Sequence, residues 1–211
     1  MTDDPSAPGA RPADDRSAVD DDTSRIPPVP RPWSEEDAAG IGAWGHPAAT
    51  YPPLLLTRVL QRHPTLAGKV RRLGEGIYLD GRLPARLRTV VILRTCARVG
   101  GAYEWGGQAA FWGPLCELTG DECDLLATGG PDEPAWSAAE RAVITAVDQL
   151  EDTGTIADEA WAALAEHLDP EQCIEVLVVS GWYRMIAVTC NALGLGIEDW
   201  MRPWPAAPTR A

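Results

Sequence analysis

The sequence has no surplus of basic residues: 18 Lys and Arg stand against 31 Asp and Glu, which gives a net charge of −13 over 211 residues. Because binding to a nucleic-acid backbone requires a cationic surface, this balance argues against general nucleic-acid affinity. The chain also shows no run of about 18 uninterrupted apolar residues and no charged leader followed by an apolar segment. We therefore expect a cytoplasmic protein that neither binds nucleic acid nor spans a membrane.

Paired cysteines and metal-binding histidine motifs are absent as well. The five cysteines are dispersed and none lies in a CxxC motif, which is typical of reduced thiols and not of a disulfide framework. The three histidines, His46, His63 and His167, show neither HxxxH nor HExxH spacing, so the sequence predicts no metal site. His63 directly precedes Pro64 and is expected at the C-terminal end of a helix.

The positive charge is concentrated in one segment. Residues 69–98 contain eight basic and two acidic side chains, so this segment carries +6 and the rest of the chain carries −19. One interpretation is that its arginines pair with the chain's own acids or with a partner subunit. The other is that one or two of them bind a small anionic ligand.

Composition divides the chain into three parts. Residues 1–30 contain seven aspartates and several prolines but no aromatic residue, and we expect them to form a disordered acidic tail. Residues 31–205 are long enough for a single domain with a substantial core. Residues 206–211 are expected to form a flexible C-terminal tail.

Helix-start signals and helical spacing of apolar residues recur throughout residues 31–205. Ser34 with Asp37, and Ser137 with Glu140, have the spacing of side chains that cap helix N-termini. The apolar run IEVLVVSG could form a buried strand, but no other strands are available to pair with it. The prediction is an all-α domain with about eight helices.

Three long helices are expected over residues 65–79, 84–99 and 171–193. Gly74 and Gly76 are expected to interrupt the first of them. The other two share a weak echo, because each has a proline at the first helical position followed by a charged turn and a β-branched apolar run. Such an echo is consistent with an internal repeat and is also the generic pattern of a buried helix.

Charge, aromatic residues and helical spacing converge in residues 84–112. The first part of this stretch places its apolar residues on or beside one broad face of a helix, and Gly100 and Gly101 end that helix. A second helix follows, in which Glu104 and Gln108 lie one turn apart on a shared face. We expect that face to contribute to the functional site.

Five short pieces follow one another in a specific order: RLPARLRTVVILR, YEWGGQ, residues 182–185, residues 191–194 and a closing Pro-Trp-Pro. In this combination the chain resembles the carboxymuconolactone decarboxylase and AhpD-like superfamily over about residues 50–205. The resemblance implies an all-helical bundle with an internal helical repeat, self-association into dimers, trimers or hexamers, and an active site beside the signature helix. Members include a lyase acting on a small dicarboxylic lactone, thiol peroxidases and many cofactor-free proteins.

The signature positions differ from those of the peroxidase branch. Where that branch has a glutamate, a CxxC pair and a histidine, this sequence has Thr89, Gly101, Glu104 and Gln108. Because a thiol peroxidase needs one thiolate to attack the peroxide and a second thiol to resolve the product, the resemblance argues against that activity. YEWxxQ is closer to the EWxxH signature of a branch without these cysteines. An amide cannot exchange a proton near neutral pH as imidazole does, so Gln108 is expected to position or polarise.

Glu104 is then the candidate for proton transfer. A carboxylate among aromatic side chains would have its pKa raised by desolvation, which suits a general acid or base. The alternative is an ion pair with Arg94 or Arg98 that joins two helices. The further candidates for substrate binding are Arg94, Tyr103, Trp105, Trp112, Tyr183 and Arg184, of which the last two could equally be interface residues.

Together these features predict a cofactor-independent enzyme that works by proton transfer on a small, anionic or cyclic metabolite, of the kind found in secondary metabolism. Decarboxylation, elimination, isomerisation and cyclisation all remain open at this point. The alternative is a ligand-binding or assembly protein that has kept the fold without the chemistry. In either case we expect a homo-oligomer with a small-molecule ligand.

Overall fold

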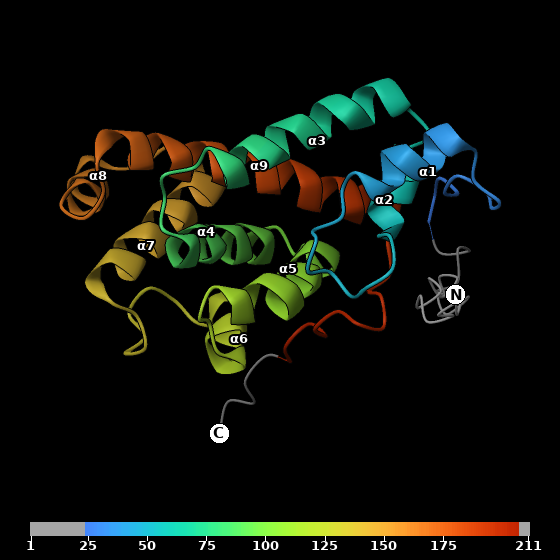
Figure 1. The fold of residues 1–211 in the computed structure, drawn as a ribbon. Coiled ribbons are helices and arrows are strands. Elements are labelled where there is room, and N and C mark those ends of the chain that lie inside the picture. Colours follow the sequence, from blue (N-terminus) through green and yellow to red (C-terminus); the bar gives the residue numbers. More distant parts are fainter. Residues whose placement is uncertain (1–23, 207–211) are drawn as a thin grey trace, which may run out of the picture.

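The structure, a computed structural model, describes residues 24–206. Within this range the regular elements are helices and no strand occurs, so the all-α prediction is confirmed (Figure 1). The described part contains nine helices where about eight were expected: α1 (Glu35–Gly42), α2 (Leu55–Leu60), α3 (Pro64–Leu79), α4 (Ala85–Arg98), α5 (Ala102–Leu115), α6 (Gly120–Thr128), α7 (Ala138–Thr153), α8 (Asp158–Ala165) and α9 (Pro170–Leu193).

The central element is α4. Residues 88–96 of this helix are all buried, because α5, α6, α7 and α9 pack around it (Figure 1). The sequence predicted burial of one broad apolar face of this helix. In the structure the buried surface extends around the whole helix and includes Arg88 and Arg94. The fully buried side chains in the middle of α4 each stabilise the fold by about 1.5–3 kcal/mol relative to an exposed position: Val90, Val91, Ile92 and Leu93.

The longest helix, α9, runs beside α4 in the same direction. Three polar contacts follow one another along both helices: Glu175 with the backbone amides of Arg82 and Leu83, Thr95 with Ser180, and Asn191 with the carbonyl of Val99. The first contact matters because the N-cap residue of α4 is a proline, Pro84, which makes no side-chain cap hydrogen bond. Glu175 therefore satisfies backbone donors just before α4 that would otherwise lack a partner.

Side-chain caps define several helix starts. The caps predicted at Ser34 and Ser137 are confirmed, and the second is a complete capping box with Glu140. Two further capping boxes begin α6 and α9, formed by Thr119 with Glu122 and by Asp169 with Gln172. In each box the two residues satisfy one another's backbone amides, so these helices begin at defined residues.

The start and the middle of α3 differ from expectation. His63 does not end a helix but caps α3, since its Nδ1 accepts a hydrogen bond from the amide of Leu66 at 3.4 Å. Gly74 and Gly76 do not interrupt α3, which is continuous over 16 residues. A Cβ atom at position 74 would lie 3.0 Å from the Trp182 ring. Gly74 therefore allows α3 to approach α9 closely.

The segment before α1 is attached to the domain. The amide and guanidinium of Arg25 donate to the carbonyls of Leu193 and Ala192, at 2.8 and 3.0 Å, and the amide of Val29 donates to the carbonyl of Arg58 at 3.1 Å. The expected acidic tail covers residues 1–30, of which residues 1–23 lie outside the described part of the chain. Residues 207–211 of the expected C-terminal tail lie outside it as well.

By length and composition alone, α9 could cross a membrane. Its most apolar window has a mean hydropathy of 1.5, and half of that window is buried inside the domain. Among residues 24–206 no other helix passes this test. Burial of this extent is what a core helix of a water-soluble domain also shows.

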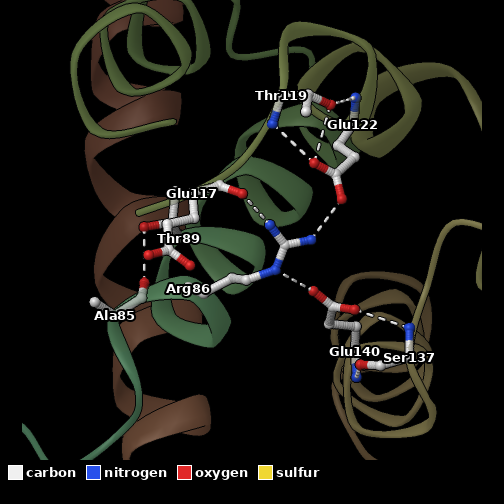
Figure 2. A network of polar contacts seen from close by, with 8 residues as sticks. All are labelled: Ala85, Arg86, Thr89, Glu117, Thr119, Glu122, Ser137 and Glu140. Carbon is white, nitrogen blue, oxygen red and sulfur yellow. Dashed lines mark hydrogen bonds and ion pairs between the residues drawn. The ribbon is translucent and has the colours of Figure 1, made fainter. Parts of the chain in front are cut away.

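Arg86 connects α4 to the N-termini of α6 and α7 (Figure 2). Its guanidinium donates to Glu140 at 2.7 Å, to Glu122 at 2.5 Å and to the backbone carbonyl of Glu117. Each of the two carboxylates also closes a capping box. Burial alone would raise the pKa of Glu122 and of Glu140, but the hydrogen bonds from Arg86 and from the capping residues outweigh it and hold both pKa values below the ordinary one.

We expect Arg86→Ala to lower the free energy of unfolding by about 1–3 kcal/mol, because it leaves two partly buried carboxylates without their charged donor. Urea denaturation at pH 7 measures this loss. The matched control is Arg82→Ala, which removes an exposed pair with Glu171 and should cost less than about 1 kcal/mol. Equal losses in the two variants would contradict the role assigned to Arg86.

The stability difference between the wild type and Arg86→Ala is expected to depend on pH. Because the pKa values of Glu122 and Glu140 are lowered in the folded protein, their contribution is present above the ordinary carboxyl pKa of about 4.3. It is lost as the pH falls through the lowered folded values. The stability difference between the wild type and Arg86→Ala should therefore shrink below about pH 4.

Candidate active site

A cavity of about 360 Å³ lies between residues 43–57, α3, α5 and α9. Six Trp and Tyr side chains line it: Trp44, Tyr51, Tyr78, Trp112, Trp182 and Tyr183. The charged and amide side chains on the wall are Glu104 and Gln108 from α5 and Arg71 and Glu75 from α3. An apolar hollow with a few convergent polar groups is the usual form of a small-molecule site.

Four polar side chains from three helices form one hydrogen-bonded chain on the cavity wall. Nε2 of Gln108 donates to Oε1 of Glu104 at 2.9 Å, and the Tyr78 hydroxyl donates to Oε1 of Gln108 at 3.4 Å. The hydroxyls of Tyr78 and Tyr183 lie 2.5 Å apart. The chain therefore begins at two phenols and ends on a carboxylate, and its central member is the Gln108 amide.

Burial raises the pKa of Glu104, while the hydrogen bond from Gln108 acts in the opposite direction. Within residues 24–206 this carboxylate takes part in no ion pair. The ion pair with Arg94 or Arg98 that the sequence left open is contradicted, because both arginines pair with aspartates of α7. Glu104 therefore faces the cavity as a partly desolvated carboxylate whose bonded partner is an amide.

Tyr78 lies among aromatic and cationic groups. Its ring stacks on Trp112 with the centroids 4.7 Å apart, and Cζ of Arg88 lies 4.8 Å from the centroid of the Tyr78 ring. Burial raises the pKa of Tyr78 strongly, and the hydrogen bond with Tyr183 and the charge of Arg88 offset only part of this rise. At neutral pH Tyr78 therefore keeps its proton and can donate it in a hydrogen bond.

Of the residues expected to form the site, the structure brings Glu104, Gln108, Trp112 and Tyr183 together around the cavity. Glu104 and Gln108 share a face of α5, as the spacing predicted. Trp112 continues the same face one turn further along. Tyr183 reaches the cavity from α9, so that it joins these residues only through tertiary packing.

Tyr103 and Trp105 do not line this cavity, although they flank Glu104 in the sequence. The Tyr103 hydroxyl donates to Glu198 at 2.5 Å, and Trp105 is fully buried with its ring edge against Trp204, 5.4 Å between centroids. The reason is helical geometry, since consecutive residues point about 100° apart around the axis. Both side chains fasten α5 to the segment that follows α9.

The arginines expected to bind substrate lie elsewhere. Arg94 donates to both carboxylate oxygens of Asp148, at 2.6 and 2.8 Å, and to two backbone carbonyls. Arg184 pairs with Glu151 of α7. The interpretation in which the basic segment pairs with the chain's own acids is confirmed for five of its members: Arg71, Arg82, Arg86, Arg94 and Arg98.

Sequence reasoning missed several residues of the cavity wall. Trp44, His46 and Tyr51 come from the loop before α2, and the His46 ring packs edge to face against Trp112 with the centroids 5.1 Å apart. The clustering of these three residues within residues 44–51 was a usable signal. Tyr78 had none, because nothing in the sequence around it indicates that its side chain reaches Gln108 and Trp112 of α5.

The signature position Gly101 is closed to larger side chains. A Cβ atom there would lie 2.6 Å from Cβ of Ala187, a distance at which something must move. A cysteine would therefore not fit at position 101 without displacement of α9. At the other signature position, the Thr89 hydroxyl donates to the carbonyl of Ala85 at 2.9 Å within its own helix.

The thiols of the chain are all buried. Burial raises the pKa of Cys96, Cys173 and Cys190, and raises that of Cys123 to about 11. The charge of Glu104 adds to this effect at Cys96 and Cys190. A reactive cysteine requires the opposite, a lowered pKa and access to solvent. Across the described residues, no group of three or more His, Cys, Asp or Glu side chains is arranged to hold a metal ion.

Comparison with known proteins supports the fold. No protein-family model and no curated protein matches the sequence. Among solved structures, the debrominase Bmp8, in a cysteine-to-alanine variant with 2,3,4-tribromopyrrole bound, is similar with a TM-score of 0.67 and 15% identity over 84% of this chain and 93% of that one.

Two further structures are similar. A protein of unknown function from Agrobacterium tumefaciens, described as an AhpD-type antioxidant defence protein, has a TM-score of 0.60 and 18% identity over 65% of this chain and 94% of its own. An alkylhydroperoxidase AhpD core from Ralstonia eutropha JMP134 has a TM-score of 0.59 and 16% identity over 74% and 95%. At these identities the likeness shows the fold, and the expected AhpD-like fold is confirmed.

The raised pKa of Glu104 predicts a pH-dependent cost in stability. Because the folded protein holds this proton more tightly than the unfolded chain, stability falls as the pH rises from the unfolded pKa of about 4.3 through the raised folded value. Glu104→Gln keeps the shape and the acceptor oxygen for Gln108 but cannot ionise. We expect this variant to melt at a higher temperature than the wild type at pH 7.

Differential scanning calorimetry at pH 7 and pH 4 measures the effect. The melting difference should shrink at pH 4, where the carboxyl group is mostly protonated in both states. The control Glu166→Gln, which removes an exposed carboxylate at the end of α8, should leave the melting temperature within about 1 °C of wild type at pH 7. The electrostatic account would be contradicted if, at pH 7, Glu104→Gln melted at the same temperature as the wild type or at a lower one.

Proposed function

We propose that the protein is a cofactor-independent enzyme that moves a proton on a small cyclic molecule bound in the cavity. Glu104 is the general base, and Gln108 holds its carboxylate by the hydrogen bond of 2.9 Å. The observation that carries this proposal is the raised pKa of Glu104, a carboxylate without an ion-pair partner among the described residues, on the wall of an apolar cavity. A general base is most effective when its pKa approaches the working pH, and burial moves Glu104 in that direction.

The charge of the cavity favours an uncharged ligand over an anionic one. Apart from Glu104, the charged residues on the wall are Arg71 and Glu75, which form an ion pair with one another. An anionic ligand would approach the Glu104 carboxylate without a cation to compensate it, which is unfavourable at a desolvated site. The aromatic wall suits a flat ring, and the similar debrominase is also a protein with a small ring compound bound.

The alternative is a protein that binds such a ligand without converting it. Thr89 and Gly101 favour this reading, since both signature positions have lost the chemistry of the peroxidase branch and position 101 has no room for it. Thiol peroxidase activity remains disfavoured by the buried thiols and their raised pKa values. We place the protein in the cytoplasm, where five unpaired thiols stay reduced.

Hydrogen exchange in D₂O tests the proposal without a known substrate. A panel of uncharged and anionic ring compounds is incubated with the protein, and deuterium incorporation at carbon is followed by proton NMR. We expect wild-type protein to accelerate exchange of at least one uncharged ring compound, and Glu104→Gln to lower that rate about 100-fold or more. Binding of ring compounds with no accelerated exchange by wild type would favour the non-catalytic alternative.

We also propose that α9 mediates self-association with a second copy of the chain. Five residues at alternating spacings of four and three form a stripe along this helix: Ile174, Val178, Gly181, Met185 and Val188. The four larger side chains are 44–60% exposed, and a Cβ atom at Gly181 would have nothing within 4 Å. The spacing is that of a coiled-coil seam, and Gly181 at its centre allows close approach of another helix.

The stripe is nearly symmetric about Gly181, with two apolar residues on each side. An antiparallel second copy would therefore place apolar side chains opposite one another along its whole length, as a two-fold symmetric contact requires. We expect Val178→Glu combined with Met185→Glu to convert the oligomer to a monomer in light scattering after size-exclusion chromatography. Leu115→Glu changes an apolar residue of similar exposure on α5 and should leave the mass unchanged. A wild-type monomer would refute the contact.

A further inference from the structure

The side-chain amide of Gln108 connects Glu104 to the two tyrosines, and each of its hydrogen bonds has a defined donor and acceptor. Its N–H donates to the Glu104 carboxylate at 2.9 Å, and its C=O accepts from the Tyr78 hydroxyl at 3.4 Å. Since Tyr78 donates its single proton to Gln108, it accepts from Tyr183 across the contact of 2.5 Å. The donor direction is therefore the same along the whole chain, from Tyr183 to Glu104.

The segment H–N–C=O of Gln108 has the same layout as the segment H–C–C=O of a carbonyl compound with a hydrogen on the adjacent carbon. In both segments one carbon atom joins two groups. The first is the N–H or C–H group that a base contacts, and the second is the oxygen that an acid contacts. Glu104 and Tyr78 contact the two ends of the Gln108 amide, and both side chains also line the cavity, where a ligand can meet them. The contact of Tyr78 with Gln108 is long for an O–H···O hydrogen bond, so a ligand oxygen in the cavity can replace it with a shorter one.

We propose that the substrates of this cavity are uncharged cyclic ketones or similar enolisable carbonyl compounds, with Glu104 taking the proton from the carbon next to the carbonyl and Tyr78 donating to the carbonyl oxygen. This inference rests on the proposed function and adds to it a second catalytic residue and a substrate class. It accounts for the two phenols at the other end of the hydrogen-bonded chain from Glu104. A proton transfer that used the base alone would not need these phenols. It also agrees with a cavity whose arginine is already paired.

The reaction balances within the cavity. The Glu104 carboxylate accepts the proton from carbon, the electron pair of that C–H bond becomes the C=C bond of the enol, and the carbonyl π pair moves to oxygen, which takes the proton of Tyr78. The reverse steps return a proton to carbon, either at the same atom or at a conjugated one. Removal of an oxygen-directed donor of this kind costs about 100-fold or more in rate in other enzymes.

Tyr183 and Arg88 are positioning residues for Tyr78. The Tyr183 hydroxyl orients the Tyr78 oxygen through the contact of 2.5 Å, and the buried guanidinium of Arg88 lies over the Tyr78 ring. A cation over the ring face stabilises the negative charge that the phenol gains as it gives up its proton. Both residues act on the reaction through Tyr78.

The test uses 1-indanone, an uncharged flat bicyclic ketone, with full-length protein in D₂O. Proton NMR follows the loss of signal at the carbon next to the carbonyl. We expect wild type to accelerate this exchange, and both Glu104→Gln and Tyr78→Phe to lower the rate about 100-fold. Tyr183→Phe should lower the maximal rate about 10-fold while the concentration of ketone at half-maximal rate stays unchanged, as a positioning role requires.

The matched control is Tyr103→Phe, which removes a buried, hydrogen-bonded phenol that does not line this cavity. It should lower the melting temperature and leave the exchange rate unchanged. Because Tyr78→Phe keeps the ring that stacks on Trp112, a melting temperature near that of wild type shows that its loss of exchange is not a loss of fold.

Three outcomes would overturn the inference, and they differ in what they leave of the proposed function. Exchange of 1-indanone that depends on Glu104 but not on Tyr78 would remove the second catalytic residue and leave the base in place. No acceleration with 1-indanone, together with Glu104-dependent exchange of indene, a ring of the same shape without a carbonyl, would remove the substrate class. Absence of Glu104-dependent exchange with every ring compound would remove both the inference and the proposed function.

Discussion

The domain depends on the neutralisation of arginine charges on its most buried helix. The middle of α4, residues 88–96, is covered on all sides by other helices, and it includes the buried Arg94, while Arg86 and Arg98 lie nearer the two ends of the helix. A guanidinium removed from water costs several kcal/mol unless an acid accompanies it. The acids come from α6 and α7, so the ion pairs of α4 hold these two helices against it. At Arg86 the same carboxylates that cap α6 and α7 also bind the arginine (Figure 2).

This pairing explains why the cavity is poor in cations. The arginines of the basic segment that point toward α6 and α7 are used there, and Glu104, on the other side of the core, meets an amide instead. Arg88 is the exception, because it points toward α3 and lies over the Tyr78 ring. The positive charge nearest the polar chain therefore supports the phenol and not the carboxylate. Two phenol hydroxyls and a carboxylate thus lie at opposite ends of one chain of hydrogen bonds.

Helices were predictable from the sequence because their signals are local: caps such as Ser137, prolines at the first position and apolar spacing. The full burial of α4 was not, since a helix covered on every side has no single apolar face to detect. In the site, Glu104 and Gln108 were predictable because they are one turn apart on one helix. Tyr103, which the sequence placed in the site beside Glu104, does not line the cavity, because sequence neighbours on a helix point in different directions. Tyr78 and Tyr183 meet only through the packing of α3 on α9.

The close contact at Gly101 connects the lost thiol chemistry to the phenols that are present. α9 approaches α5 so closely there that Ala187 occupies the space of any side chain at position 101. Tyr183 lies one turn before Ala187 and therefore on the same face of α9. The face of α9 that fills the space at position 101 therefore also carries Tyr183, whose hydroxyl meets Tyr78 where α3 packs on α9. A larger residue at position 101 would therefore have to displace the helix that carries Tyr183.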